Sequence, residues 1–201
     1  MSSIFLLSPA NTAGKRAKVL MNPGAEFDLA KRLRNDELTL GETFSFLSGL
    51  YFRGKLAYAR KFGASENIFV ITSHRGLVSP DTVVDLDELR AFATVPIDLE
   101  EPRYVRPMMR SARELAAAID TTCPVVLLGS IATRKYIEPL GEVFGARLVF
   151  PAAFVGRGDM SRGGLMLRSV VSGKELDYIP VATAVRKGSR PPKLEKLDRG
   201  K

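Results

Sequence analysis

One stretch of sequence decides the fold, Arg147-Leu-Val-Phe150 followed closely by Phe154-Val-Gly-Arg-Gly-Asp-Met-Ser-Arg-Gly-Gly-Leu-Met-Leu-Arg168. The first, apolar run predicts a buried strand, the glycines predict a loop, and the later apolar residues predict a helix that begins near Met160. A glycine-rich loop between a strand and a helix presents free N–H groups and a positive helix end, which suit phosphate or another anion.

The polar residues of this loop point to the same chemistry. Arg157 and Arg162 offer planar forks for bidentate phosphate contacts, and Ser161 lies between them as a substrate-binding candidate. Asp159 is the exception, because a carboxylate weakens an anion site unless it takes part in the chemistry. We therefore take Asp159 as a catalytic candidate. The alternative is a tight turn with an Arg–Asp pair at the surface.

Three further apolar runs predict strands of the same buried kind: Ser3–Leu7, Asn67–Thr72 and Pro124–Leu128. Helical patterns lie between the runs, over residues 42–62, 106–119 and 131–144, and Gly145 is a suitable stop for the last of them. Alternating strands and helices predict an α/β domain with a mostly parallel central sheet flanked by helices. Residues 175–181 are expected to add an edge strand.

The composition indicates one domain and a polyanionic partner. The chain has 201 residues, a net charge of +8 and a pI near 9.8, which favours nucleic acid. We divide it into an α/β domain, residues 1–185, and a basic tail, residues 186–201. The tail is interpreted either as a contact to nucleic acid or as a solvated segment without a partner.

Cysteine and histidine usage excludes several classes of site. One cysteine, Cys123, cannot form an internal disulfide and is expected in the core, and a single histidine leaves no Cys/His zinc pattern. No run is long enough for a transmembrane helix, and the N-terminus lacks the basic flank of a signal peptide. We expect a cytoplasmic protein without a membrane contact, a metal or another cofactor.

In parallel sheets, ligands bind beyond the carboxyl ends of the strands. The segment Ser8-Pro-Ala-Asn-Thr12 follows the first strand and contributes Ser8 and Thr12 as substrate-binding candidates. Asn11 either caps a helix or contacts a base edge and orients a water, and we take it as a second catalytic candidate. Lys15 and Arg16 are expected at phosphates.

The segment Ser48–Tyr58 is unusual because Gly49 and Gly54 interrupt a helical pattern. Either two helices pack closely there, or a nucleic acid approaches the backbone, with base stacking on Tyr51 and phosphate contacts from the two cations Arg53 and Lys55. His74, after the second strand, is either a proton donor at the site or a structural residue.

Three motifs in this order resemble the YaaA peroxide-stress family and its YaaA-like relatives. Ser8–Thr12 resembles that family's Ser-Pro-Ala-Lys-Thr with asparagine for lysine, and Ile71–Pro80 is similar to its Leu-Ser-x-x-Tyr-Gly-Leu-x-x-Pro. Gly156–Arg162 resembles its Ala-Arg-Gly-x-Met-Ser-Arg. The resemblance covers most of the chain and implies DNA binding.

A more distant resemblance is to the uracil-DNA glycosylases. Their fold has a catalytic loop after the first strand and a DNA-intercalating loop after the last, which corresponds in place to Phe154–Arg162. The present chain lacks that family's aspartate in the first loop and its histidine in the last loop. Any catalytic groups must therefore differ.

Together these observations predict a DNA glycosylase that flips out a modified base, excises it and leaves an abasic site. A bulky modified base, as in glucosylated phage DNA, would place the protein in antiviral defence. Two alternatives remain open: a non-catalytic, YaaA-like DNA-binding protein that protects under stress, and an enzyme that cleaves the N-glycosidic bond of free nucleotides.

Overall fold

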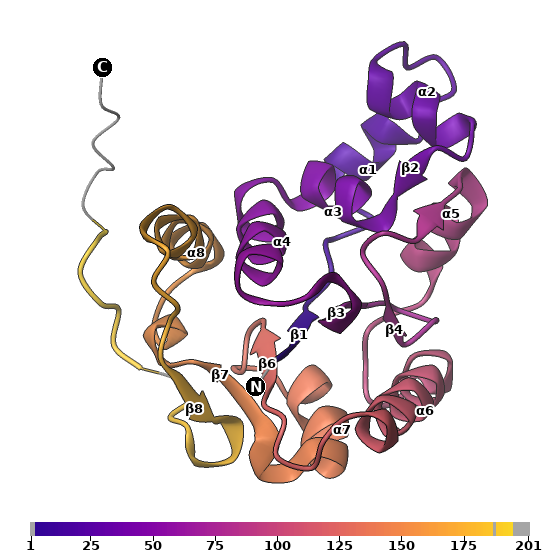
Figure 1. The fold of residues 1–201 in the computed structure, drawn as a ribbon. Helices are drawn as coiled ribbons and strands as arrows, with labels where there is room; N and C mark the ends of the chain where they lie inside the picture. Colours follow the sequence, from indigo (N-terminus) through magenta and orange to yellow (C-terminus); the bar gives the residue numbers. More distant parts are fainter. Residues whose placement is uncertain (1–2, 187, 195–201) are drawn as a thin grey trace.

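The computed structural model of the chain describes residues 3–186 and 188–194 and has a central six-stranded sheet (Figure 1). The strands lie in the order β4-β3-β1-β6-β7-β8, with bounds β1 Ile4–Leu7, β3 Ile68–Ile71, β4 Leu77–Val78, β6 Val125–Leu128, β7 Leu148–Pro151 and β8 Tyr178–Pro180. The four inner strands are parallel, whereas β4 and β8 pair antiparallel at the two edges. The four predicted strands and the predicted edge strand near the C-terminus are confirmed.

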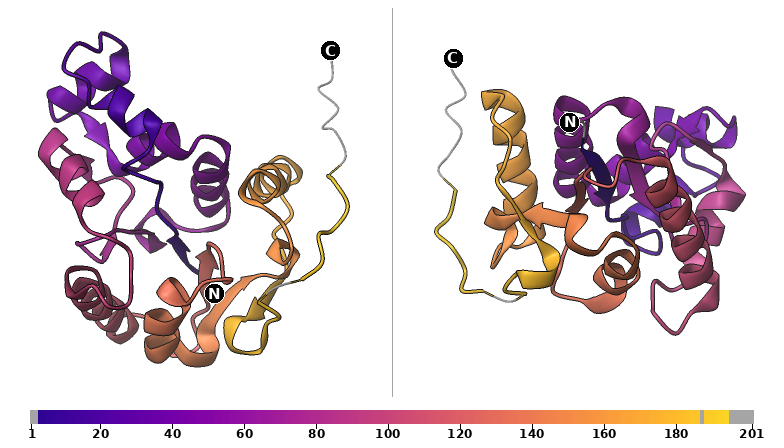
Figure 2. Two further views of the ribbon diagram at one scale, coloured as in Figure 1. Left: turned by 180° about the vertical axis from the view of Figure 1, so that it is seen from behind. Right: turned by 60° about the horizontal axis from the view of Figure 1, so that its bottom comes forward.

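Helices lie on both faces of the sheet, with α4 and α8 side by side on one face and α6 and α7 on the other (Figures 1 and 2). Their bounds are α1 Lys15–Leu20, α2 Asp28–Arg34, α3 Leu40–Ser48, α4 Leu50–Phe62, α5 Leu86–Thr94, α6 Pro102–Ala118, α7 Arg134–Phe144 and α8 Asp159–Ser172. None of the helices in the described part of the chain has the length and apolarity needed to cross a bilayer.

The sequence did not reveal the shortest elements. A second sheet pairs β2 (Leu38–Thr39) with β5 (Val83–Val84), and each strand has only two residues. Two residues cannot show a periodicity, so these strands carry no pattern that could be recognised. Cys123 is buried in the core as expected.

The expectation of one helix over residues 42–62 is wrong, because the chain breaks between α3 and α4 at Gly49. This glycine has φ +60°, which strains any residue with a Cβ. A Cβ there would also lie 2.7 Å from Nη1 of Arg16. That nitrogen donates a hydrogen bond to the Phe46 carbonyl oxygen at 3.0 Å, near the C-terminal end of α3. Arg16 therefore helps to hold the break, and its expected contact with a phosphate stays a prediction.

Gly54 has a different cause, which is the close packing of α4 against α8. A Cβ on Gly54 would lie 2.8 Å from the carbonyl oxygen of Gly163, and a Cβ on Gly163 would lie 2.8 Å from that of Leu50. Both glycines are buried at the contact. The alternative of close helix packing is therefore confirmed for Gly54.

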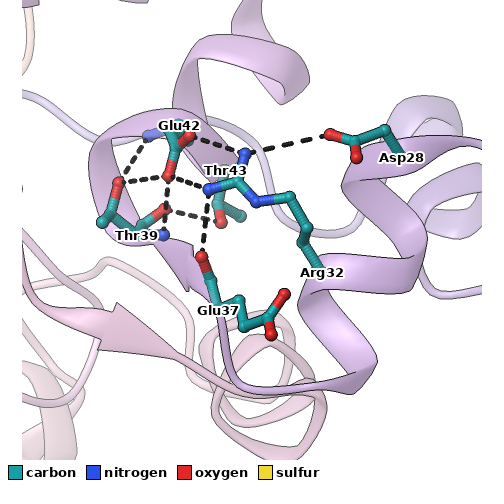
Figure 3. Close-up of polar contacts among 6 residues, drawn as sticks. All are labelled: Asp28, Arg32, Glu37, Thr39, Glu42 and Thr43. Atoms are coloured by element: carbon teal, nitrogen blue, oxygen red, sulfur yellow. Dashed lines mark hydrogen bonds and ion pairs between the residues drawn. The ribbon is translucent and has the colours of Figure 1, made fainter.

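A polar network fixes the start of α3 (Figure 3). Thr39 and Glu42 form a reciprocal capping box, and Arg32 on α2 binds the Glu42 carboxylate through both terminal nitrogens, at 2.8 and 3.0 Å. These bonds lower the pKa of Glu42 to about 2, and the hydrogen bond from Arg32 contributes most to that shift. Arg32 also donates to the Glu37 carbonyl and lies 3.9 Å from Asp28. The network ties α2 to α3.

The contact between α4 and α8 predicts that adding one methyl group at Gly54 lowers the folding stability of the protein. Gly54→Ala should destabilise the protein by about 1–3 kcal/mol, because a Cβ would meet backbone that can retreat only if the helices separate. Gly141→Ala is the matched control, since it also lies in a helix and has nothing within 4 Å of its Cβ position. The control should be neutral or up to ~1 kcal/mol more stable. Urea unfolding of both variants is the measurement, and equal stabilities would contradict the prediction.

Candidate functional site

The loops that follow β1, β3, β6 and β7 meet at the carboxyl edge of the sheet, because these strands are parallel. The chain adds strands on one side of β1 and then on the other, so the switch point lies between β1 and β6. Ser8 ends the first of these strands, and its N–H donates to the Leu128 carbonyl at 3.2 Å. Gly129 continues β6 and leaves no room for a side chain, since its Cβ would lie 3.0 Å from that of Ser8.

A buried lysine lies directly beneath this switch point. Lys55 on α4 has no exposed surface, and its Nζ donates to both the carbonyl oxygen and, at 2.9 Å, the Oγ of Ser8. The ammonium also lies 4.3 Å from the centre of the Tyr51 ring. Burial lowers the pKa of Lys55 to about 7, with the nearby charge of Asp159 acting in the opposite direction. Lys55 is expected from the sequence at a DNA phosphate, but the structure shows it buried, where it anchors the start of the loop after β1.

A second buried cation lies beside Lys55. Arg162 is 9% exposed, and its Nε donates to the Phe154 carbonyl at 3.2 Å while its guanidinium lies 5.6 Å from the ring of that residue. Its only carboxylate among the described residues is Asp159, at 3.8 Å. Arg162 therefore does not reach the surface as a free phosphate contact, but its charge acts on the groups around it.

The Tyr51 hydroxyl completes this buried cluster. Tyr51 is 7% exposed, and its buried hydroxyl oxygen has no hydrogen-bond partner among the described residues. Burial raises its pKa, and the neighbouring Arg162 and Ser8 partly oppose this shift. Because the ring is enclosed and covered by Lys55, the expectation that a base stacks on Tyr51 does not fit the structure. We call Ser8, Tyr51, Lys55 and Arg162 the buried cationic cluster.

A pocket of about 360 Å³ opens next to this cluster. Its polar groups come from the loops after two strands, β1 and β3, and from the start of α7: Asn11, Thr12, Ser73 and Lys135. Its walls include three aromatic rings: Phe44, Phe92 and Tyr136. We call this the Asn11 pocket. Tyr136 lies between this pocket and the cluster. Burial raises its pKa, and the nearby Tyr51 and Asp159 raise that pKa further.

Asn11 is exposed and holds its own loop in shape. Its Oδ1 accepts a hydrogen bond from the Ala13 N–H at 3.0 Å, and the cap residue of α1 is Gly14. Asn11 is therefore not the helix cap that one interpretation assumed. Its amide nitrogen has no partner among the described residues, so it is available to a ligand in the pocket.

Asp159 borders a second depression instead. It is the first residue of α8 and its side chain is 68% exposed. The cap position before it, Gly158, provides no side-chain hydrogen bond to the first turn. This depression measures about 820 Å³ and lies between the start of α8 and residues 190–194. We call it the Arg157 groove.

The remaining candidates lie in different places. Ser161 lies in the first turn of α8 and accepts a hydrogen bond from Arg157, in the loop before that helix, at 3.2 Å. Lys15 and Arg53 are exposed on α1 and α4. His74 lies outside the residues that line the Asn11 pocket; its Nε2 is 3.6 Å from Glu88 and its ring packs on Phe92. This packing fits the structural interpretation of His74.

Sequence reasoning missed the aromatic walls of the Asn11 pocket. Phe44 and Phe92 come from α3 and α5, and their rings meet edge to face with centroids 5.9 Å apart. Aromatic residues at helical spacing carry the same signal whether they fill a core or line a pocket, so no local pattern distinguishes the two. Tyr136 lies within the helix predicted over residues 131–144, and the sequence assigned it no role in a site.

Comparisons of the chain with protein-family models, with curated proteins and with solved structures found no significant match. Among the described residues, no three histidine, cysteine or acidic side chains gather in a group that could hold a metal ion. The geometry at the carboxyl edge of the sheet is thus the main guide to the function.

Burial of Lys55 predicts a characteristic pH dependence of stability. The folded-state pKa is about 7, whereas an unfolded chain has the ordinary value of 10.5. Between these values the unfolded state holds a proton that the folded state has lost, so stability rises with pH. Relative to Lys55→Met, the wild type should therefore gain up to ~1.4 kcal/mol per pH unit between pH 7 and 9.

The measurement is urea unfolding of both proteins at several pH values, since all other titrating groups cancel in the difference. Lys61→Met provides the control, because Lys61 lies on the same helix with an exposed side chain. Its stability difference from the wild type should not change with pH. A constant difference between the wild type and Lys55→Met would contradict a buried amine of low pKa.

Proposed function

We propose that the protein binds DNA and cleaves the N-glycosidic bond of a nucleotide whose base has left the stack and entered the Asn11 pocket. The observation that carries this proposal is the pocket itself: about 360 Å³, walled by aromatic rings, at the switch point of the sheet and next to the buried cationic cluster. Pockets for small ligands have volumes of about 300–1,000 Å³ with a few well-placed polar groups.

The lining of the pocket suits a nucleobase. Phe44, Phe92 and Tyr136 contribute apolar atoms to the lining, and Asn11 offers an amide whose donor and acceptor can pair with a base edge. Lys135 adds a cation at the rim, suited to a carbonyl oxygen or a phosphate. The free amide nitrogen of Asn11 makes it the residue that would read the base.

The charges around the pocket suit the bond to be broken. When the bond between C1′ and the base nitrogen breaks, its electron pair leaves with the base and the sugar becomes cation-like. Asp159 supplies a negative charge for that sugar and an acceptor for the proton of the attacking water. Arg162 and Lys55 lie beside it and supply positive potential for the electron-rich base, which is finally protonated from solvent.

The partner is inferred from charge. The chain has a net charge of +8, and exposed cations such as Lys15, Arg53 and Lys193 are available for phosphates. The sequence resemblance to the uracil-DNA glycosylases is in keeping with the same assignment, since under that resemblance the loops after β1 and β7 would correspond to that family's catalytic and intercalating loops. A modified base remains the preferred substrate, and with it a role in antiviral defence.

One observation favours the alternative of a binding protein without chemistry. Asp159 is 68% exposed and lines the Arg157 groove rather than the Asn11 pocket, so water screens its charge unless a ligand covers it. In that case the DNA would be held at the same edge, but no base would be released. Formation of abasic sites separates the two functions.

The proposal predicts a large effect of Asp159→Asn. Base release in single-turnover reactions should fall by roughly 10²-fold or more, because the amide keeps the shape of the carboxylate but removes its charge. DNA affinity should be equal or slightly higher, because repulsion from phosphates falls. The substrates are DNAs with different modified bases, assayed by alkaline cleavage at abasic sites.

Asp28→Asn is the matched control. Asp28 is also the first residue of a helix, is also exposed and also faces an arginine, Arg32 at 3.9 Å, but it lies on α2. This variant should release base at the wild-type rate. Equal rates for both variants would remove Asp159 from the mechanism, and absence of release by the wild type from every DNA would leave the binding protein as the function.

A further inference from the structure

The C-terminal segment, residues 188–194, is packed against the glycine loop and forms one wall of the Arg157 groove. A Cβ at Gly156, which has φ +72°, would overlap the carbonyl oxygen of Ser189, and a Cβ at Gly188 would lie 2.5 Å from Val155. Arg157 donates to the Pro192 carbonyl oxygen at 3.2 Å. The yellow trace in Figure 1 accordingly runs beside α8. The described part of the basic tail is therefore built into the fold; Lys187 and residues 195–201 lie outside the described residues.

The groove combines positive charge with apolar surface. Its cationic lining residues come from both walls: Arg157 and Arg168 from the loop and α8, and Arg190 and Lys193 from the C-terminal segment. Asp159 is the one acidic residue in that lining. The first turn of α8 lines the same groove and has no side-chain cap, so the positive end of the helix adds to this charge. The groove therefore attracts anions.

The apolar part of the lining is the second observation. Leu50, Met160 and Leu194 line the groove with the two prolines at 191 and 192, and Met160 is 67% exposed. A site for phosphate alone would need no such surface, and a large exposed apolar side chain at a cationic groove indicates a ligand with an apolar part. Unpaired bases provide flat apolar faces, whereas a duplex hides them in its stack.

We propose that the Arg157 groove binds a single-stranded segment of nucleic acid, with phosphates at Arg190 and Lys193 and base faces against Met160 and the prolines. The inference rests on the proposed function and specifies its substrate: DNA that is single-stranded, or locally opened, beside the excised base. Asp159 lines the groove, so a strand held there passes the carboxylate. The groove has a volume of about 820 Å³, which gives room for a short stretch of single strand.

The test measures fluorescence anisotropy of a labelled oligothymidine and of a duplex of equal length, over a range of salt concentrations. The full-length double variant Arg190→Gln/Lys193→Gln should lose affinity for the single strand, and the slope of log K against log salt should fall by about 1.4, that is ~0.7 for each lost phosphate contact. The control Arg106→Gln/Arg110→Gln removes the same charge from exposed positions on α6. It should retain the wild-type slope, because α6 lies on the opposite face of the sheet (Figure 1).

A third variant tests the apolar contact. Met160→Ser should weaken binding of the single strand several-fold without changing the salt slope, because it removes a base contact and no charge. Equal losses for the two double variants, or tighter binding of the duplex than of the single strand, would overturn the proposal. An inactive wild type that binds single strands through Arg190 and Lys193 would leave this groove in place and refute only base excision. If the wild type releases base and all variants bind the single strand as the wild type does, the groove proposal would be refuted and base excision would stand.

Discussion

The close contact between Gly54 on α4 and Gly163 on α8 is the constraint on which the rest of the carboxyl edge depends. Because neither residue has a side chain, the two helices approach until backbone meets backbone. Arg162, next to Gly163, is thereby brought against Tyr51, and Lys55, next to Gly54, is enclosed below Ser8. A glycine pair that costs each helix intrinsic stability thus gives the site its buried charges.

Two buried cations without a buried carboxylate are an unfavourable arrangement for a protein interior. Lys55 responds by a lowered pKa and by two hydrogen bonds to Ser8, and Arg162 by a carbonyl contact and the ring of Phe154. Stability alone does not explain such a pair, since apolar side chains would fill the same space at lower cost. The arrangement provides a positive potential beside the loops after β1 and β7, and the proposed release of an electron-rich base would use such a potential.

The sequence revealed the strands because each is a short apolar run between turn residues, as in Ile4–Leu7 and Val125–Leu128. It failed where tertiary contacts overrule local pattern. Nothing near Gly49 in the sequence shows that the Arg16 side chain occupies the space beside it, so one helix was predicted where there are two. The local sequence around Lys55 does not distinguish it from a surface cation, because its burial depends on tertiary contacts such as those with Ser8. The glycine-rich loop after β7 was located correctly, because glycines and arginines cluster there beyond what a turn requires.

The position of Asp159 also follows from this edge of the sheet. The carboxylate is held at the first turn of α8, where the helix end favours a negative charge, and Arg162 reaches it from the buried side. Its outer side remains open to water, so its charge has little effect until a ligand excludes that water. A strand lying in the Arg157 groove would do so, because Met160 and residues 190–194 border the same depression. Binding and chemistry would then be coupled at one residue, whose charge gains strength only when the nucleic acid is in place.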